Sequence, residues 1–403
     1  MTRRVMGCIA CAAAALALGS AVAADTSGAD VSTAAKPNWL LIRGFWPAGA
    51  GPEVQGAASG RGWLGFGRGD STKRSLVLGS LRRVGGKTQF AKTVLPKSQG
   101  PMMIVGSQLY YHLPDISGKP GALRSVSLLA NGGVGAPQAP PVDPESVPPS
   151  QYDPVVLDGI QVGDRAVWLL AGGSSSAFYL WACCTRAGAL SPLTRLIDPK
   201  RNMTSLQLGL DSRGRLWLAW LDLLRRKSWG AARLVELDPD TLSPRTPKPL
   251  VSPGSDTWVQ PLRLVCGRFC RATAVSLRGG IATWAPGERA ATLMPLGTRL
   301  HPAGLLDMSF NSGKLVVGSA RTLTYRRPPW SAEQISIVRG DARGAHARRV
   351  RSTAPVPFGP SSPFMWQPPI YGAFVPGALV FFKLYYNFRR DSETRVLVGS
   401  LPS

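Results

Sequence analysis

The sequence predicts an all-β fold, a β-propeller of seven four-stranded blades. Three observations lead to this class. From Trp39 onwards, short apolar runs alternate with breaks of Gly, Pro, Asp or Ser. No segment longer than about ten residues has the 3.6-residue period of an amphipathic helix. Groups of three or four apolar runs recur at intervals of about fifty residues, which is the spacing of propeller blades.

Composition agrees with many short strands. The chain has 403 residues, which suits a large repeat fold, and 44% of them are hydrophobic, which is enough for a sizeable core. The 45 Gly and 35 Pro residues are spread through the chain instead of forming one tract. This distribution favours strands separated by turns over a disordered tail.

Seven groups of apolar runs follow one another along the chain. Their apolar runs begin near Val54, Met102, Asp153, Leu206, Trp258, Leu305 and Ala378. The last group ends one strand short, at Arg395–Leu401. We expect Trp39–Ile42 to supply the missing strand, which would close the ring and protect both edges. The alternative is a pair of β-sandwiches joined at the Pro-rich stretch Ala136–Pro154.

The clearest unit is a β-hairpin at Leu206–Asp222. Its turn is Asp211–Gly214, where Asp can bond its own backbone and Gly tolerates a positive φ. Leu residues alternate before the turn, and Leu216, Trp217, Leu218 and Trp220 follow it. We expect these tryptophans to pack between blades.

The hairpin also carries a resemblance. Asp211, Gly214 and the run from Arg215 to Trp220 resemble the Asp-box hairpin of secreted bacterial propellers, including sialidase-like ones. The match is partial and occurs once, because Gly209 stands where that motif has Ser. The resemblance implies a propeller fold and carries no activity by itself.

The N-terminus predicts export. Arg3 and Arg4 precede an apolar run from Val5 to Val22, followed by the small-residue cleavage site Ala21–Ala23. This pattern indicates a signal peptide over residues 1–24, a flexible leader over 25–37 and one propeller domain over 38–403. An uncleaved membrane anchor is the alternative, although the run is short for a bilayer span. The sequence predicts no transmembrane segment after the signal peptide is removed.

The charge predicts the kind of partner. The formal net charge is +24, and removing residues 1–24 takes away two arginines and no acid. An exported protein with such a charge should adhere to an anionic cell-envelope polymer or acidic polysaccharide. The alternative is that Arg-rich composition alone explains the charge. No pattern for specific nucleic-acid binding stands out.

Basic and aromatic residues collect in predicted links between the second and third strands of blades. Those links lie at one end of a propeller, where guanidiniums and rings suit an anionic polymer. The opposite end is also basic, through Arg213, Arg215, Arg268 and Arg271, which weakens the contrast. The predicted ligand-binding residues are Arg225, Arg226, Lys227, Trp229, Arg326, Arg327, Trp330, Arg389 and Arg390.

Four cysteines remain after export, which in an oxidising compartment suggests disulfides. Cys266 and Cys270 flank a short turn, so a bridge between them would staple a hairpin. We favour that bridge together with one between the adjacent Cys183 and Cys184. A metal site is the alternative, but no His is near in sequence, and no metal or other cofactor is predicted.

Catalytic signals are sparse. The mature chain has three histidines, His112, His301 and His346, and no nucleophile elbow in a supporting context. The sequence therefore favours an extracellular binding or scaffold module for an anionic envelope polymer or a protein. The alternative is a sialidase-like or other glycan-active propeller enzyme. Its candidate catalytic residues are Tyr385, Tyr386, Arg389 and Asp391.

Overall fold

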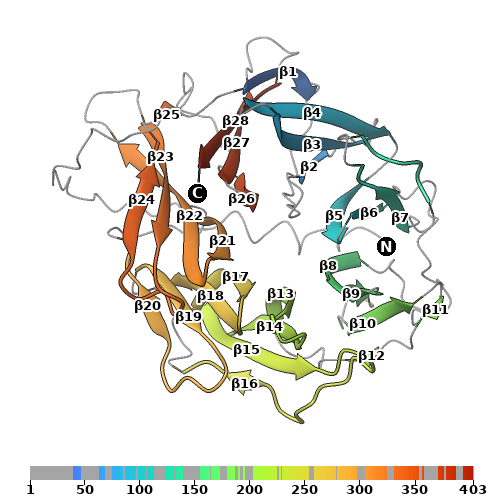
Figure 1. Cartoon of the computed structure of the whole chain (residues 1–403), viewed down its shortest axis with the longest axis vertical. Helices are drawn as coiled ribbons and strands as arrows, with labels where there is room; N and C mark the ends of the chain where they lie inside the picture. The colour runs from blue at the N-terminus through green and yellow to red at the C-terminus, as the bar shows by residue number, and fades with distance from the viewer. Residues whose placement is uncertain are drawn as a thin grey trace, which may run out of the picture.

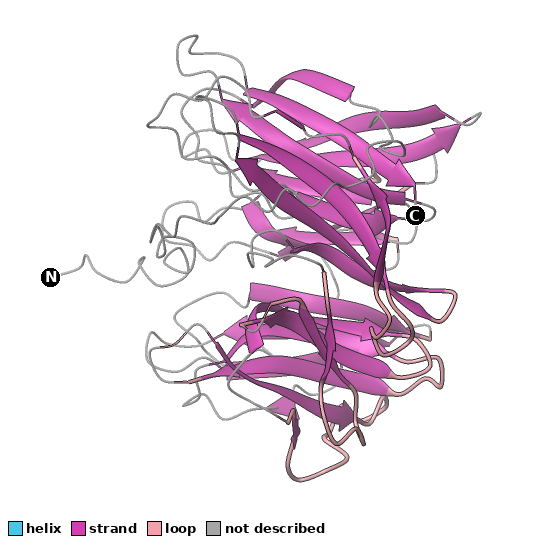
Figure 2. Ribbon diagram, turned by 90° about the vertical axis from the view of Figure 1, so that its left-hand side faces the viewer, coloured by secondary structure: helices cyan, strands magenta, loops and turns pink. Residues whose placement is uncertain are grey.

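The structure is a computed structural model in which the described residues form strands and turns, without helix (Figure 2). No helix in this part of the chain could therefore cross a membrane. The described residues are 40–46, 63–68, 75–84, 87–96, 99–105, 107–112, 123–129, 133–138, 155–163, 165–172, 179–186, 189–190, 194–195, 203–224, 227, 229–253, 258–277, 279–296, 305–324, 331–353, 356–357, 371–375, 378–386 and 394–402.

The described strands form a ring of consecutive antiparallel units, in which each unit's first strand lies nearest the centre (Figure 1). Units one to three comprise β2 (Trp63–Arg68), β3 (Ser75–Val84), β4 (Lys87–Pro96); β5 (Gln99–Val105), β6 (Gln108–His112), β7 (Leu123–Ser127); and β8 (Val155–Val162), β9 (Arg165–Gly172), β10 (Tyr179–Arg186), β11 (Ala189–Leu190), β12 (Thr194–Arg195). Units four and five comprise β13 (Met203–Leu210), β14 (Leu216–Leu223), β15 (Trp229–Leu237), β16 (Leu250–Val251); and β17 (Trp258–Cys266), β18 (Cys270–Ser276), β19 (Ile281–Trp284), β20 (Thr292–Met294). Units six and seven comprise β21 (Leu305–Asn311), β22 (Lys314–Thr324), β23 (Ser331–Arg339), β24 (Arg348–Ser352), β25 (Val356–Pro357); and β26 (Tyr371–Val375), β27 (Ala378–Tyr386), β28 (Thr394–Pro402), with β1 (Leu40–Trp46).

The inner strands contact one another in sequence order, β2, β5, β8, β13, β17, β21 and β26. This is the arrangement of a β-propeller, so the predicted fold class is confirmed, and the two-sandwich alternative does not describe it. Seven inner strands are described, and the hydrogen-bonded sheets number six, because β15 also pairs with β17 and joins the fourth and fifth units into one eight-stranded sheet. Seven blades for the whole chain stays a prediction, since this count covers described strands only.

The ring is closed by the N-terminal strand. β1 pairs antiparallel with β28, with Leu40 opposite Val398 and Ile42 opposite Val396. β1 therefore forms the outer strand of the last unit, as the sequence predicted for Leu40–Ile42. This pairing covers an edge that would otherwise expose unpaired backbone groups.

The hairpin turn between β13 and β14 forms as predicted. The buried Asp211 carboxylate accepts N–H bonds from Arg213 and Arg215, both at 3.0 Å, and Gly214 has φ of 76°. The same turn recurs between β23 and β24, where Asp341 accepts from Arg343 and Ala345 and Gly344 has φ of 83°. The sequence Asp-x-Arg-Gly thus marks two turns of one geometry.

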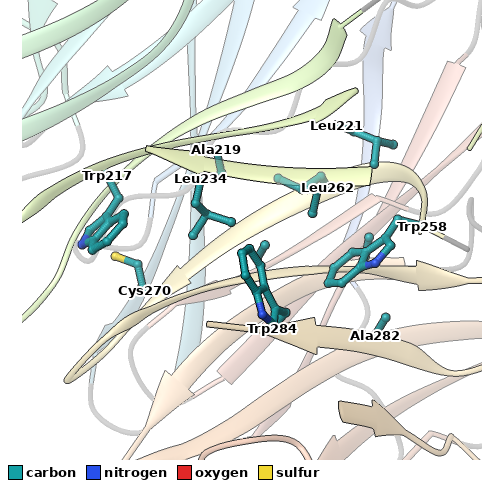
Figure 3. Close-up of a cluster of buried hydrophobic side chains, with 12 residues drawn as sticks. Trp217, Ala219, Leu221, Leu234, Trp258, Leu262, Cys270, Ala282 and Trp284 are labelled. Carbon is teal, nitrogen blue, oxygen red and sulfur yellow. The ribbon is translucent and has the colours of Figure 1, made fainter. Parts of the chain in front are cut away.

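The core consists of layers between blades, and β14 shows why. Alternate side chains of a strand point to opposite faces. Leu216, Leu218 and Trp220 pack with β8 and β9 side chains on one side. Trp217, Ala219 and Leu221 pack with β17 and β18 on the other, in the cluster of Figure 3. The prediction that these tryptophans fill inter-blade layers is confirmed.

Trp258 is the largest fully buried residue of that cluster, with 0% of its surface exposed. We predict that Trp258→Ala lowers the free energy of unfolding by about 3–5 kcal/mol, because it leaves a cavity between two blades. Urea unfolding followed by tryptophan fluorescence and circular dichroism measures the loss. Leu293→Ala, at a site 43% exposed, is the control and should change stability little. Equal effects of the two variants would contradict this account of the core.

Candidate functional site

Most of the predicted binding and catalytic residues lie outside the described residues. These are Arg225, Arg226, Arg326, Arg327, Trp330, Arg389, Arg390 and Asp391. Tyr385 and Tyr386 end β27, paired with Arg395 and Thr394, and only their backbones are described. Their roles stay predictions.

Lys227 and Trp229 are the two members of the predicted basic end that the structure describes. Lys227 lies in the link from β14 to β15, and Trp229 is the first residue of β15. The Lys227 ammonium sits 5.0 Å from the centroid of the Trp229 ring, and Lys227 is exposed. A cation and a ring are therefore brought together in one of the predicted links.

The predicted disulfide between Cys266 and Cys270 is confirmed, and it closes the turn from β17 to β18. Cys183 and Cys184 lie in β10, and their side chains are outside the described part of the chain. The described residues contain no group of three or more His, Cys, Asp or Glu side chains arranged to hold a metal ion.

The inner strands share a feature that the sequence analysis missed. In β8, β13, β17 and β21 the pairing with the next strand is interrupted by an irregularity of the β-bulge type. The first residue to regain register is polar in each case: Asp158, Gln207, Arg263 and Asp307. Four consecutive blades therefore place a polar side chain at one level of the innermost strand.

Three of these side chains bond the backbone of the next inner strand. Asp158 Oδ2 accepts from Leu208 N at 2.6 Å, Gln207 Oε1 from Leu264 N at 2.7 Å, and Asp307 Oδ2 from Phe374 N at 2.6 Å. We call these contacts the axial clamps. Each receiving residue immediately follows the equivalent position of its own blade, except in the last unit, where no bulge is present.

The second carboxylate oxygen of each aspartate accepts a bond from its own strand. Asp158 Oδ1 accepts the N–H of Gly159, and Asp307 Oδ1 accepts that of Met308. Met308 has no acceptor from the preceding blade, because the equivalent residue there is Arg263, which is a donor only. Arg263 therefore occupies a clamp position without being able to act as a clamp.

Burial and nearby charge shift the pKa values of Asp158 and Asp307. Desolvation raises the pKa of Asp158 from 3.8 to about 6, against the lowering effects of the Leu208 and Gly159 N–H groups and the Arg263 charge. Desolvation likewise raises the pKa of Asp307, opposed by the Phe374 N–H, the Arg263 charge and the Met308 N–H.

The Arg263 charge acts on both carboxyls, so the three groups share one electrostatic neighbourhood. We call Asp158, Arg263 and Asp307 the axial triad. A guanidinium can bind a carboxylate or sulfate in a bidentate manner, and a carboxyl with a pKa near neutrality can give or take a proton. The axial triad therefore combines an anion-binding group with an acid–base group.

A sequence signal for these positions exists. Each is preceded by leucine in an otherwise apolar strand: Leu157-Asp158, Leu206-Gln207, Leu262-Arg263 and Leu306-Asp307. Aligning the strand groups on this leucine would have identified the polar position. That these positions lie on neighbouring innermost strands follows only from the closed fold.

Comparisons with known proteins give only distant structural similarities. No protein-family model matches the chain, and no curated protein matches its sequence. Among solved structures, an ulvan lyase of a polysaccharide lyase family is similar with a TM-score of 0.49 and 10% identity, over 88% of this chain and 95% of that one. A periplasmic gluconolactonase from Pseudomonas aeruginosa has a TM-score of 0.42 and 13% identity, over 73% and 83%. An endo-arabinase from Bacteroides thetaiotaomicron has a TM-score of 0.34 and 12% identity, over 74% and 90%. Similarities at these TM-scores and identities transfer no activity to this chain.

The Gln207 clamp gives a stability prediction. Gln207→Ala leaves the Leu264 N–H without its acceptor, which should lower the free energy of unfolding by about 1–3 kcal/mol. Gln161→Ala is the matched control, since the Gln161 amide makes an exposed bond to Gly163 O within its own turn. Chemical unfolding of both variants tests the clamp, which a loss no larger than that of the control would contradict.

The raised pKa of Asp158 predicts a pH dependence of stability. Its folded-state pKa of about 6 lies above the ordinary 3.8, so between these values the folded protein binds more protons than the unfolded chain. The Asp158 contribution to stability is thus full at low pH and is lost as the pH rises through about 6. Asp158→Asn should remove this fall, as measured by the difference in unfolding free energy between variant and parent across that range. A difference that does not vary with pH would show that the pKa is unshifted.

Proposed function

We propose that the protein is a glycan-active enzyme that acts on an acidic carbohydrate at the axial triad. The observation that carries the proposal is that Asp158, Arg263 and Asp307 occupy equivalent positions on innermost strands, where the Arg263 charge acts on both carboxyls. This is the alternative predicted from the sequence, with a different set of residues. Tyr385, Tyr386, Arg389 and Asp391 stay predicted candidates.

Arg263 supports the anionic character of the substrate. Its neighbours at equivalent positions serve to tie blades together, and an arginine cannot accept the backbone N–H that this role requires. The side chain makes no ion pair with a carboxylate among the described residues. Its guanidinium is therefore suited to hold a uronate carboxylate or a sulfate of a bound sugar.

Asp158 supports the proton-transfer step. General acid–base catalysis is most efficient when the pKa of the catalytic group lies near the working pH. Each oxygen of Asp158 accepts one backbone N–H, and a carboxylate oxygen has a further lone pair, so the group can still bind a proton. The backbone bonds hold the carboxyl in one orientation. Asp307 is held in the same way, as a second carboxyl.

The proposal is tested on a panel of uronate-containing polysaccharides. We expect Asp158→Asn to lower kcat by roughly 10²–10⁴-fold, which is the usual contribution of a general acid or base. Arg263→Gln should mainly raise KM for the acidic substrate. New reducing ends report hydrolysis, and the ultraviolet absorbance of an unsaturated uronate reports elimination.

Asp238→Asn provides the matched control, because Asp238 is exposed in a turn outside the triad. It should leave kcat and KM unchanged. Full activity of Asp158→Asn, with its fold intact by circular dichroism, would exclude the axial triad as the catalytic site.

Binding without turnover is the second candidate function, and the exposed Lys227 beside Trp229 favours it. In that case the protein would act as a secreted binding or scaffold module for an anionic envelope polymer or a protein partner. Export rests on residues 1–24, which lie outside the described residues, as does the whole leader at 25–37. Retention on an acidic glycan without product formation by any variant would favour this candidate.

A further inference from the structure

The turns between the first and second strands of the fourth and fifth units carry a second cluster of basic residues. We call Arg213, Arg215, Arg268 and Phe269 the turn patch. The described turns gather along one side of the ring (Figure 2). They lie at the end opposite the link that holds Lys227, because β13 and β14 join at one end and β14 and β15 at the other.

Three guanidiniums surround one ring. The Cζ atoms of Arg213, Arg215 and Arg268 lie 4.9, 5.7 and 5.7 Å from the centroid of Phe269. Phe269 remains 43% exposed. Attraction between cations and the ring face offsets part of the repulsion among the like charges.

The charge of this cluster is not balanced. Arg215 is paired with Asp211, with its Nη2 at 2.7 Å from Oδ2. Arg213 and Arg268 are exposed, and neither has a carboxylate partner among the described residues. Arg271, which the sequence placed with them, is buried and held by two bonds to Glu288, so it does not belong to the patch.

Three acidic side chains of neighbouring turns have other basic partners. Glu236 and Asp238 lie near Arg245, and Glu288 pairs with Arg271. The nearby turn of the sixth unit instead adds the exposed Lys314. That turn is close, since a Cβ on Gly267 would lie 3.2 Å from the Phe310 ring. This part of the rim therefore keeps a local excess of positive charge.

The patch is also held rigid before any ligand arrives. Ser212 N donates to Gly267 O at 2.8 Å, which joins the two turns. The disulfide between Cys266 and Cys270 closes the turn that carries Phe269. Trp217 lies beside Cys270 (Figure 3) and underlies Arg215, whose Cζ is 5.4 Å from the Trp217 ring. Preorganised groups bind with a smaller loss of conformational entropy.

We propose that the turn patch is a binding site for an acidic polysaccharide. Arg213 and Arg268 bind its carboxylate or sulfate groups, and the exposed part of Phe269 packs against a sugar ring. The disulfide favours a polysaccharide over a nucleic acid, because such bridges persist outside the cytosol, where acidic glycans are the usual polyanions. This site is separate from the axial triad and does not depend on catalysis there.

The test measures binding of dextran sulfate and of polygalacturonate, with uncharged dextran as the blank, over a series of salt concentrations. The variant Arg213→Ser with Arg268→Ser should weaken binding roughly tenfold or more and reduce the salt dependence, because two contacts with anionic groups are lost. Comparing the two polymers distinguishes sulfate from carboxylate recognition. Phe269→Ala should weaken binding without changing the net charge.

The matched control is Arg348→Ser with Arg349→Ser, which removes the same charge from exposed positions of β24. It should change binding little. Equal weakening by both double variants would overturn the proposal in favour of general charge attraction. Tighter binding of a single-stranded oligonucleotide, lost only in the patch variant, would overturn the choice of polysaccharide.

The binding measurement separates this proposal from the proposed function. The loss of dextran sulfate binding in the variant Arg213→Ser with Arg268→Ser is expected whether or not the parent turns over any uronate-containing polysaccharide. Cys266→Ser with Cys270→Ser should weaken binding while the ring stays folded by circular dichroism, since the bridge orients Phe269. Unchanged affinity in the folded cysteine variant would contradict the claim that the disulfide preorganises the patch.

Discussion

The hydrogen bond from a polar side chain of one inner strand to the backbone of the next underlies the arrangement of this ring. Inner strands of neighbouring blades face each other across side-chain layers, so most of their backbone groups cannot pair between blades. The bulge before Asp158, Gln207 and Asp307 turns a side-chain oxygen towards the following blade, where it accepts an N–H at 2.6 to 2.7 Å. An unpaired N–H at this depth would cost about 1–3 kcal/mol. The three clamps therefore fix how far the blades that they join are advanced along the axis relative to each other.

The need for an acceptor at this position makes Arg263 an exception among the inner strands. A clamp needs only an acceptor, which is why a neutral Gln and two Asp side chains serve equally well in three blades. Arginine in the same position cannot accept the N–H of the next inner strand. The Met308 N–H donates to Asp307 of its own blade. The substitution also places a positive charge where it acts on Asp158 and Asp307. The same residues thus have a structural role and a chemical one, and the carboxyls are oriented by the bonds that hold the blades together.

Sequence patterns predicted the strands, the closing pair of Leu40–Ile42 with β28, the Asp211 turn and the Cys266–Cys270 bridge, because each depends on residues close in sequence or on a simple period. The axial triad was not predicted, because its members are separated by 44 and 105 positions and the Arg263 charge reaches both carboxyls only in the folded ring. A single polar residue in an apolar strand also gives no sign of a site until the equivalent positions of the neighbouring blades are known. The sequence did indicate that the end carrying the turn patch is basic, but it could not separate the members of the patch from Arg271. Arg271 looks equivalent to Arg268 in sequence, whereas in the structure it is buried and Glu288 neutralises it.

The described arginines differ in whether they have a carboxylate partner. Arg215, Arg233, Arg245 and Arg271 have carboxylate partners and contribute to local structure. Arg213, Arg263 and Arg268 have none among the described residues, yet each lies where other groups restrict it: the axial position for one, the Phe269 ring for the others. An Arg-rich composition would scatter unpaired arginines over exposed strands, as on β24, and does not require them to gather about one ring or replace a clamp. Their placement is better explained by an anionic ligand that supplies the missing charge, either at one of these sites or along a polymer that meets each site separately.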